Sequence, residues 1–400
     1  MSVTRRGFLS LGAAVAAGTA LTGCGAVNRS SAATTSDKVM NAEPIKVGAS
    51  LELSGASAVF GRMQERAIAI SLAELNVDGV RVGDSYRRLD VVIRDNQGNA
   101  ATAGDVADEF AGMGVAAIIG GISPEAAFAT LTVAEAKHIP YLSMCAADAV
   151  AIPLSTRKFT YKLAPNSSDV ATRLARQIRR YGQKDVVLLA TEDTLGQDGV
   201  RAMTAALAAA GRKLADTVKL PASGKDYAGA AARAVDESPD AVVVWTSPAN
   251  AVRAVQALRD ADRKAAIYLP PTAIDDDTLS DNHAEVMQDV YVLYSPVLAG
   301  APFIVNTAGG RATRTFVNRY TQEYGTFSGC APYAADALAL VAAAARRVST
   351  VDSRRLRGAL ESTPYDGVAG AYGFSPIDHG GMAPEVLAMF QAKGRGWTRL

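Results

Sequence analysis

The feature that most constrains the fold is a regular alternation, from Ile45 onward, of short runs rich in valine and isoleucine with longer alanine-rich segments. The short runs are continuously apolar, which is typical of strands buried on both faces in a parallel sheet. The longer segments repeat apolar residues at helical spacing. The pattern predicts an α/β fold, a mostly parallel sheet with helices on both faces. The predicted strands are 45–51, 89–95, 116–121, 140–144, 185–191, 213–220, 240–246, 266–271 and 289–295.

Chain length and the number of strands together indicate two domains. All these strands would make one unusually large sheet, and 400 residues exceed the size of an ordinary domain. A boundary is predicted at 161–169, where a new helix begins after a proline and a serine. Residues 311–349 are predicted to be almost entirely helical, and 367–397 to form a hairpin of short strands around a polar turn at 375–381. The other predicted helices are 63–76, 102–113, 169–182, 198–211, 227–238 and 249–262.

The first residues have the features of an export signal rather than of the folded body. Arg5-Arg6 precede an apolar run rich in glycine and alanine, and this start resembles a twin-arginine signal. Residues 21–24, Leu-Thr-Gly-Cys, resemble a bacterial lipobox, which implies lipidation at Cys24 and removal of residues 1–23. The alternative of a transmembrane helix is disfavoured because the run is short and weakly apolar. Residues 24–44 are polar and predict a flexible tether.

Composition and motif searches argue against several other classes of function. A net charge of +1 gives no electrostatic footprint for nucleic acid. The sequence contains no phosphate loop, dinucleotide fingerprint, nucleophile elbow or zinc-protease motif, and His138, His283 and His379 stand in unrelated contexts. No enzyme activity, cofactor or metal is therefore expected. The acidic stretch 274–283 is interpreted as a solvated loop, with a cation site as the alternative.

Two turns of similar sequence mark where a ligand is expected. "GGISPEA" and "WTSPANA" each end a predicted strand with Ser-Pro, which suits a capping serine followed by proline at the first position of a helix. The carboxyl ends of parallel strands and the helix N-termini that follow them lie along one edge, which binds ligands in such sheets. Most strand-to-helix turns only connect elements, but a matching turn in each domain predicts two facing walls of a cleft.

The order of these segments resembles the leucine/isoleucine/valine-binding family of type 1 periplasmic solute-binding proteins. The resemblance runs from about Ile45 to the C-terminus and rests on 45–61, 89–110, 139–144, 159–171 and 365–376, together with the segments between them. It implies two Rossmann-like lobes joined by three hinge crossings. The first lobe would comprise 45–162 and 292–366, and the second 163–291 and 367–400.

The same resemblance implies a function and its partners. The chain would be an extracytoplasmic, lipid-anchored protein that captures a small organic solute, amino-acid-like or a related amide or carboxylate, between two closing lobes. It would deliver this solute to the permease and ATPase of an ABC importer. The alternative is a ligand-sensing receptor domain of the same fold. The importer is favoured because no transmembrane or signalling segment follows in the sequence. Neither hypothesis involves nucleic acid.

The resemblance also implies a set of ligand-contacting positions, and this chain matches the family's residue types at only some of them. Phe60 stands where the family places an aromatic ring, with ordinary core packing as the alternative. Several positions that usually carry hydroxyls or aromatics hold other residues, so a conventional branched-chain amino acid is disfavoured, and Glu125 or Asp275 would supply the charge for an amine. Cys145 and Cys330 either pair or remain separate buried thiols. The predicted contacts are Ser54, Phe60, Ser123, Glu125, Cys145, Ala147, Leu195, Thr246, Ser247 and Thr272.

Overall fold

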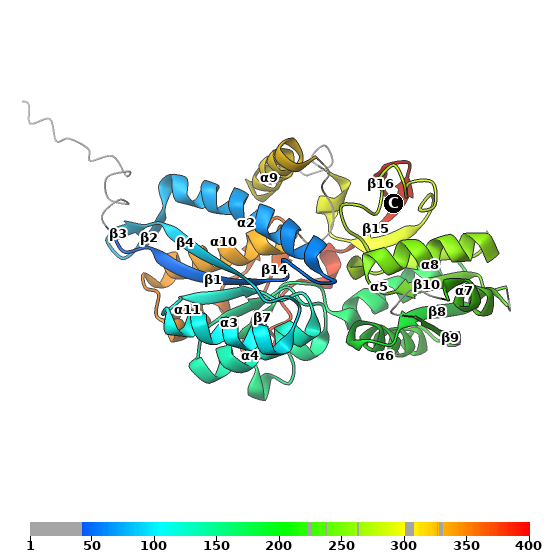
Figure 1. Ribbon diagram of the computed structural model, residues 1–400, viewed down its shortest axis with the longest axis horizontal. Helices are drawn as coiled ribbons and strands as arrows, with labels where there is room; N and C mark the ends of the chain where they lie inside the picture. The colour runs from blue at the N-terminus through cyan, green and yellow to red at the C-terminus, as the bar shows by residue number, and fades with distance from the viewer. Residues whose placement is uncertain are drawn as a thin grey trace, which may run out of the picture.

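The structure is a computed structural model that describes residues 42–221, 226–236, 238–261, 264–300, 308–325, 327 and 331–400. Within this part of the chain the strands form two main sheets, each with its own helices, side by side in Figure 1. We call them the first and second lobes. The predicted α/β class with two lobes is confirmed. The export signal, most of the tether, Cys24 and Cys330 lie outside the described residues.

The first lobe is built on a five-stranded sheet in which all neighbours run parallel. Both faces are buried: Ile118 and Tyr141 pack with α3 and α4, whereas Ile119 and Leu142 pack with the core that includes α2. This double burial explains why the strands are continuously apolar. In order across the sheet, the strands are β4 (Leu89–Asp95), β1 (Ile45–Leu51), β5 (Ala117–Gly120), β6 (Tyr141–Ser143) and β7 (Thr160–Lys162).

The second lobe is built on a seven-stranded sheet that is parallel over its first five strands and antiparallel over the last two. In order, the strands are β9 (Leu214–Leu220), β8 (Val186–Thr191), β10 (Ala241–Trp245), β11 (Ala266–Leu269), β12 (Tyr291–Tyr294), β15 (Ala388–Lys393) and β16 (Gly396–Arg399). Two small antiparallel pairs complete the strands: β2 (Val80–Val82) with β3 (Ser85–Arg87), and β13 (Tyr365–Asp366) with β14 (Ala371–Tyr372).

Helices alternate with the strands as the sequence predicted. In the first lobe α3 packs on α4, and α10 packs on α2 and α11; in the second, α5 packs on α6 and α7 on α8. The bounds are α2 (Ala58–Asp78), α3 (Ala100–Gly112), α4 (Pro124–Lys137), α5 (Ser167–Arg180), α6 (Thr194–Ala209), α7 (Tyr227–Val235), α8 (Pro248–Ala261), α9 (Ala308–Tyr324), α10 (Ala331–Val348) and α11 (Ser353–Leu360). No helix among the described residues is both long and apolar enough to span a bilayer.

Both sheets have the same winding, and it fixes where their binding edges lie. β1 lies between β4 and β5, and β8 lies between β9 and β10, so the connections that leave β1 and β8 run to one side of their sheets and those that leave β5 and β10 run to the other. The direction of winding therefore reverses between β1 and β5 and between β8 and β10. In open parallel sheets, ligands bind at the carboxyl ends of the strands beside this reversal. The turns after β5 and β10 are the two Ser-Pro turns of the sequence. Each therefore lies at the reversal point of its own sheet.

The crossings between the lobes differ in detail from the predicted boundaries. The boundary between 291 and 292 falls inside β12, which belongs to the second sheet. Residues 367–382 contact first-lobe elements: the backbone N–H groups of Val368 and Ala369 donate to Asp336 of α10, and a bridge joins Gly380 to Lys162 of β7. The third crossing therefore falls between these contacts and β15.

The C-terminal region also differs from its predicted form. The turn at 375–381 contains one single bridge, Ser375 with Asp378, and is flanked by another, Tyr372 with Met382, rather than by the strands of a longer hairpin. The longer antiparallel pair is β15 with β16, which turns at Gly394, where φ is +56°. Glycine adopts this left-handed backbone without steric cost, so the tight turn forms there.

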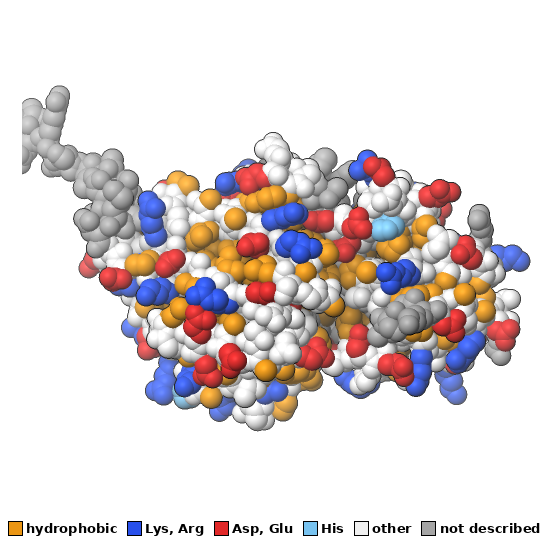
Figure 2. Space-filling view, in the orientation of Figure 1, with side chains coloured by type: hydrophobic (Ala, Val, Ile, Leu, Met, Phe, Trp, Pro, Cys, Tyr) orange, Lys and Arg blue, Asp and Glu red, His pale blue; other side chains and the backbone are white. Residues whose placement is uncertain are grey.

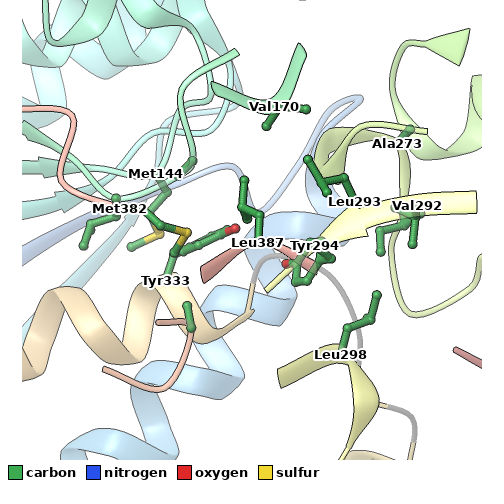
Figure 3. Packing of buried hydrophobic residues seen from close by; sticks show 14 of the residues in the cluster. Met144, Val170, Ala273, Val292, Leu293, Tyr294, Leu298, Tyr333, Met382 and Leu387 are labelled. Carbon is green, nitrogen blue, oxygen red and sulfur yellow. The ribbon is translucent and has the colours of Figure 1, made fainter. Parts of the chain in front are cut away.

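One hydrophobic core continues through the crossings from lobe to lobe. Figure 3 shows Met144, Tyr333 and Met382 on the first-lobe side, with Leu387 and Tyr294 beside them toward the second lobe. All five side chains are buried. This packing fixes the base of the space between the lobes, which leaves their facing edges to form a site.

Candidate functional site

A cavity of about 450 Å³ lies between the lobes, and loops at the carboxyl ends of both sheets line it. The first lobe contributes residues that follow β1, β4, β5, β6 and β7, and the second contributes residues that follow β8, β10 and β11. Figure 2 shows hydrophobic side chains gathered at the boundary between the two halves of the molecule. Both Ser-Pro turns contribute to the lining, so the predicted pair of facing walls is present.

The turn after β5 depends on its two glycines. A Cβ at Gly120 would lie 2.0 Å from the carbonyl oxygen of Ser50, and one at Gly121 would lie 2.3 Å from the hydroxyl of Tyr141. Both glycines also have positive φ, +121° and +71°. The glycine pair therefore lets this turn pack directly onto the neighbouring strands and aims the next residues at the cavity.

The buried side chain of Glu52 holds the turn after β5 in place. Glu52 follows β1, is fully buried, and its Oε1 accepts hydrogen bonds from the backbone N–H groups of Ile122 (2.9 Å) and Ser123 (3.1 Å). Burial raises the pKa of the Glu52 carboxyl above its ordinary value, and the two backbone donors oppose this rise. The Glu52 side chain thus accepts the hydrogen bonds of the two backbone N–H groups in this turn.

Helix α4 starts at this turn as the sequence predicted. Ser123 is the N-cap, because its Oγ accepts from the backbone N–H of Ala126 at 3.3 Å, and Pro124 occupies the first helical position. Glu125 follows on the exposed surface of the first turn and reaches the second lobe, where its Oε1 accepts from Thr194 Oγ1 at 3.5 Å. This contact links the two lobes across the cavity.

The second-lobe wall carries two buried donors. Trp245 ends β10 and is 1% exposed; its indole Nε1 has no hydrogen-bond partner among the described residues, and neither has Thr272 Oγ1. Both residues line the cavity, and the short 3-10 helix that contains Thr272 contacts β10. Beside them Ser247 and Pro248 begin α8. A buried donor without a partner is costly, so an acceptor on a bound molecule would be stabilising here.

The remainder of the lining is mainly apolar. Phe60 of α2, Met144 after β6, Leu195 of α6 and Tyr333 of α10 contribute to it. Burial raises the pKa of the Cys145 thiol to about 12, so this thiol stays protonated and acts as part of the wall. An apolar cavity with a few polar groups is suited to binding a small organic molecule.

The first crossing borders the cavity and is held by a buried lysine. Lys162 is fully buried, and its Nζ donates to the carbonyl oxygens of Ala164 (2.9 Å) and Pro165 (2.7 Å) and to Asn166 Oδ1 (3.1 Å). Burial lowers the pKa of Lys162 to about 8. Since Ala164 and Pro165 line the cavity, this lysine fixes the position of part of its wall.

The structure brings most of the predicted contact residues to the cavity. Ser54 does not line it, and its backbone N–H donates to Asp95 Oδ1 instead. Thr246 is fully buried behind the wall. The residues that do line it are Phe60, Ser123, Glu125, Cys145, Ala147, Leu195, Ser247 and Thr272.

Sequence reasoning missed several lining residues. Trp245 and Asp193 were identifiable in principle, because each stands at or just after the end of a predicted strand. Asp193 caps α6 by accepting from Gly196 N at 2.9 Å. Tyr333 had no local signal, because it reaches the cavity from α10, far along the chain.

The acidic stretch 274–283 forms a loop. Its Asp275 accepts from Thr278 Oγ1 at 2.9 Å, and burial raises the pKa of Asp275. The described residues contain no group of three or more histidine, cysteine or acidic side chains placed to hold a metal ion.

Comparisons with known proteins agree with this arrangement. A family model described as "Periplasmic binding protein" matches residues 44–396. An extracellular ligand-binding receptor from Rhodopseudomonas palustris HaA2 superposes with a TM-score of 0.78 at 20% identity, covering 89% of this chain and 99% of that one. A solute-binding protein of an ABC transporter from Rhodopseudomonas palustris BisB5 was solved in complex with 3,4-dihydroxybenzoic acid. It superposes with a TM-score of 0.74 at 19% identity, covering 90% of this chain and 96% of that one. These likenesses concern the fold.

Two further matches extend the range of relatives. A leucine-binding protein, LivK, from Thermotoga maritima superposes with a TM-score of 0.76 at 16% identity, covering 89% of this chain and 97% of that one. Glutamate receptor 3.7 of Arabidopsis thaliana is 29% identical over 147 residues, which are 36% of this chain and 15% of the receptor. The second match therefore concerns only a small part of that receptor.

Proposed function

Because the chain belongs to the periplasmic binding protein family, we propose that it binds a small organic solute between its two lobes and delivers it to an ABC importer. The solute is amino-acid-like, or a related amide or carboxylate. The observation that carries the proposal is the cavity of about 450 Å³ at the carboxyl ends of both sheets. This volume lies in the range of small-molecule sites, and its position is where open parallel sheets bind ligands.

Binding is coupled to the relative position of the lobes. A solute that contacts Ser123 on one wall and Thr272 on the other interacts with both lobes only when they are close together. Such a ligand stabilises the closed arrangement by its differential affinity for it. No covalent step is needed, and the partners of the closed form are a membrane permease and its ATPase.

The solved neighbours support the class of solute. One was solved with 3,4-dihydroxybenzoic acid and another is described as leucine-binding. Both compounds are small organic molecules with an apolar part, which fits the lining formed by Phe60, Met144 and Leu195.

The proposal includes an extracytoplasmic location with a lipid anchor at Cys24, which rests on the twin-arginine and lipobox resemblance of residues 5–24. Detergent-phase partitioning tests this part. The wild-type protein should enter the detergent phase and the Cys24→Ala variant the aqueous phase. Equal partitioning of the two would contradict lipidation at this residue.

The binding function is tested by thermal unfolding of the purified protein in the presence of a solute panel. The panel contains amino acids, their amides, aromatic acids and small peptides. A ligand present at a hundred times its Kd stabilises the folded state by about 2.7 kcal/mol. Native mass spectrometry of the purified protein identifies any solute that remains bound through purification. If no panel member raises the Tm and no bound solute is found, the proposed function is wrong.

A further inference from the structure

The charged side chains that line the cavity all have the same sign. They are Glu125 from the first lobe and Asp193 and Asp275 from the second, and no lysine, arginine or histidine is among the described lining residues. Glu125 and the Asp193 region meet across the cleft, since Glu125 accepts from Thr194 Oγ1. Acidic groups on both lobes attract a cation between them and repel an anion, and this preference is strongest when the lobes are close.

Several backbone donors around the cavity that could hold a solute carboxylate are already taken by carboxylates of the protein. Glu52 accepts from the N–H groups of Ile122 and Ser123 in the turn after β5. Asp148 accepts from the N–H groups at the start of α5, those of Ser167 (2.7 Å) and Ser168 (3.2 Å).

At the start of helix α6, as at that of α5, a carboxylate of the chain accepts a backbone hydrogen bond. Its N-terminal donor Gly196 N is capped by Asp193. N–H groups at helix starts and in tight turns are the usual ligands of anions. At each of these positions around the cavity, the protein supplies the anion from its own chain.

Two uncharged donors on the second-lobe wall have no partner. They are Trp245 Nε1 and Thr272 Oγ1, each buried and without a hydrogen-bond partner in the described part of the chain. Trp245 is 1% exposed, and both residues line the cavity. An indole N–H and a hydroxyl suit a neutral acceptor such as an amide carbonyl.

We propose that the preferred solute of this cavity carries a cationic amine, an apolar body and an uncharged acceptor such as an amide, and that it has no free carboxylate. This inference rests on the proposed function and narrows its solute class. The amine faces the acidic side chains, and the amide carbonyl faces Trp245 and Thr272. The apolar body lies against Phe60 and Leu195. Aromatic faces in the lining add favourable contacts for a cation.

Four compounds with one apolar body separate the contributions of amine and carboxylate. They are leucinamide, 4-methylpentanamide, leucine and 4-methylpentanoate, and the corresponding phenylalanine series provides an aromatic body. Calorimetric titration of the full-length mature protein should give the lowest Kd for one of the two amino-acid amides. The matching free carboxylate without an amine should bind at least about tenfold more weakly, because like charges face each other across the cavity.

A matched pair of variants assigns the preference to the cavity. Glu125→Gln keeps the acceptor for Thr194 and removes one charge, so it should weaken binding of the amino-acid amide severalfold and leave binding of the neutral amide unchanged. Glu65→Gln removes an exposed carboxylate on α2, away from the lining, and should change neither. Equal effects of the two variants would overturn the inference.

The outcomes also distinguish this inference from the proposed function. Tighter binding of 4-methylpentanoate or 3-phenylpropanoate than of the amides would overturn the inference and leave the solute-binding function intact. If none of the eight compounds binds, the charge of any ligand found in the broader panel decides: a cationic amine supports the inference, and an anionic or neutral ligand overturns it. Absence of any ligand contradicts the proposed function, and the inference fails with it.

Discussion

At the scale of residues, buried carboxylates hold loops in place, one at the site and one near the crossings between the lobes. Glu52 holds the turn after β5, and Asp336 holds the segment after β13. Asp336 accepts from Val368 N at 2.6 Å, Ala369 N at 2.8 Å and Tyr372 Oη at 2.9 Å. Each acid thus replaces the partners that a loop would otherwise find in water, which lets the loop pack against the core.

The Asp336 carboxyl makes a testable prediction about pH. Burial raises its pKa from 3.8 to about 7, although three hydrogen bonds oppose the rise. An acid with a raised folded-state pKa binds a proton more strongly in the folded protein, so its contribution to the free energy of unfolding falls as pH rises from about 4 to about 7. The loss across this range is on the order of 4 kcal/mol.

Denaturant unfolding at several pH values checks this. Asp336→Asn does not titrate, so the stability difference between wild type and variant should be largest near pH 4 and shrink toward pH 8. The variant will be less stable throughout, because its amide nitrogen faces a donor. A difference that stays constant with pH would contradict the raised pKa.

At the scale of elements, the first crossing is an ordered connection between β7 and α5. Lys162 donates to three oxygens within 163–166, and Asp148 caps the first N–H groups of α5. The sequence predicted a boundary here from the proline and serines alone. It did not indicate that a lysine would be fully buried, because lysine is almost always exposed and only the assembled oxygens make its burial tolerable.

Replacing this lysine should destabilise the connection. Lys162→Met keeps the length of the side chain and leaves three buried acceptors without a donor, so we expect a loss of about 3 kcal/mol in the free energy of unfolding. Lys158→Met is the matched control, because Lys158 is exposed just before β7. The control should lie within about 0.5 kcal/mol of wild type. Guanidinium unfolding measures both, and equal stabilities would show that the buried hydrogen bonds contribute nothing net.

At the scale of the whole molecule, the sequence predicted the repeating strands and turns. It missed features that depend on contacts between residues far apart in the chain. All nine predicted strands occur, and inner strands such as β8 and β10 were visible locally because burial on both faces leaves a continuous apolar run. The two Ser-Pro turns were predicted at the cavity because each follows the carboxyl end of a strand that is visible in the sequence. Tyr333 was missed, since α10 carries it to the cavity from far along the chain. The third crossing was misplaced because the side-chain contacts of Asp336 decide it.

The central claim is that the solute is held in the cavity between the lobes, and a cavity-blocking variant tests it most directly. Ala249 lines the cavity in the first turn of α8 and is exposed, so Ala249→Trp fills the site without disturbing the core. Calorimetric titration with the best panel solute should show one-to-one binding to wild type and binding weaker by at least about a hundredfold, about 2.7 kcal/mol, in the variant. An unchanged Tm confirms that the variant is folded. Equal affinity of the two proteins would contradict the account, because the solute would then bind elsewhere.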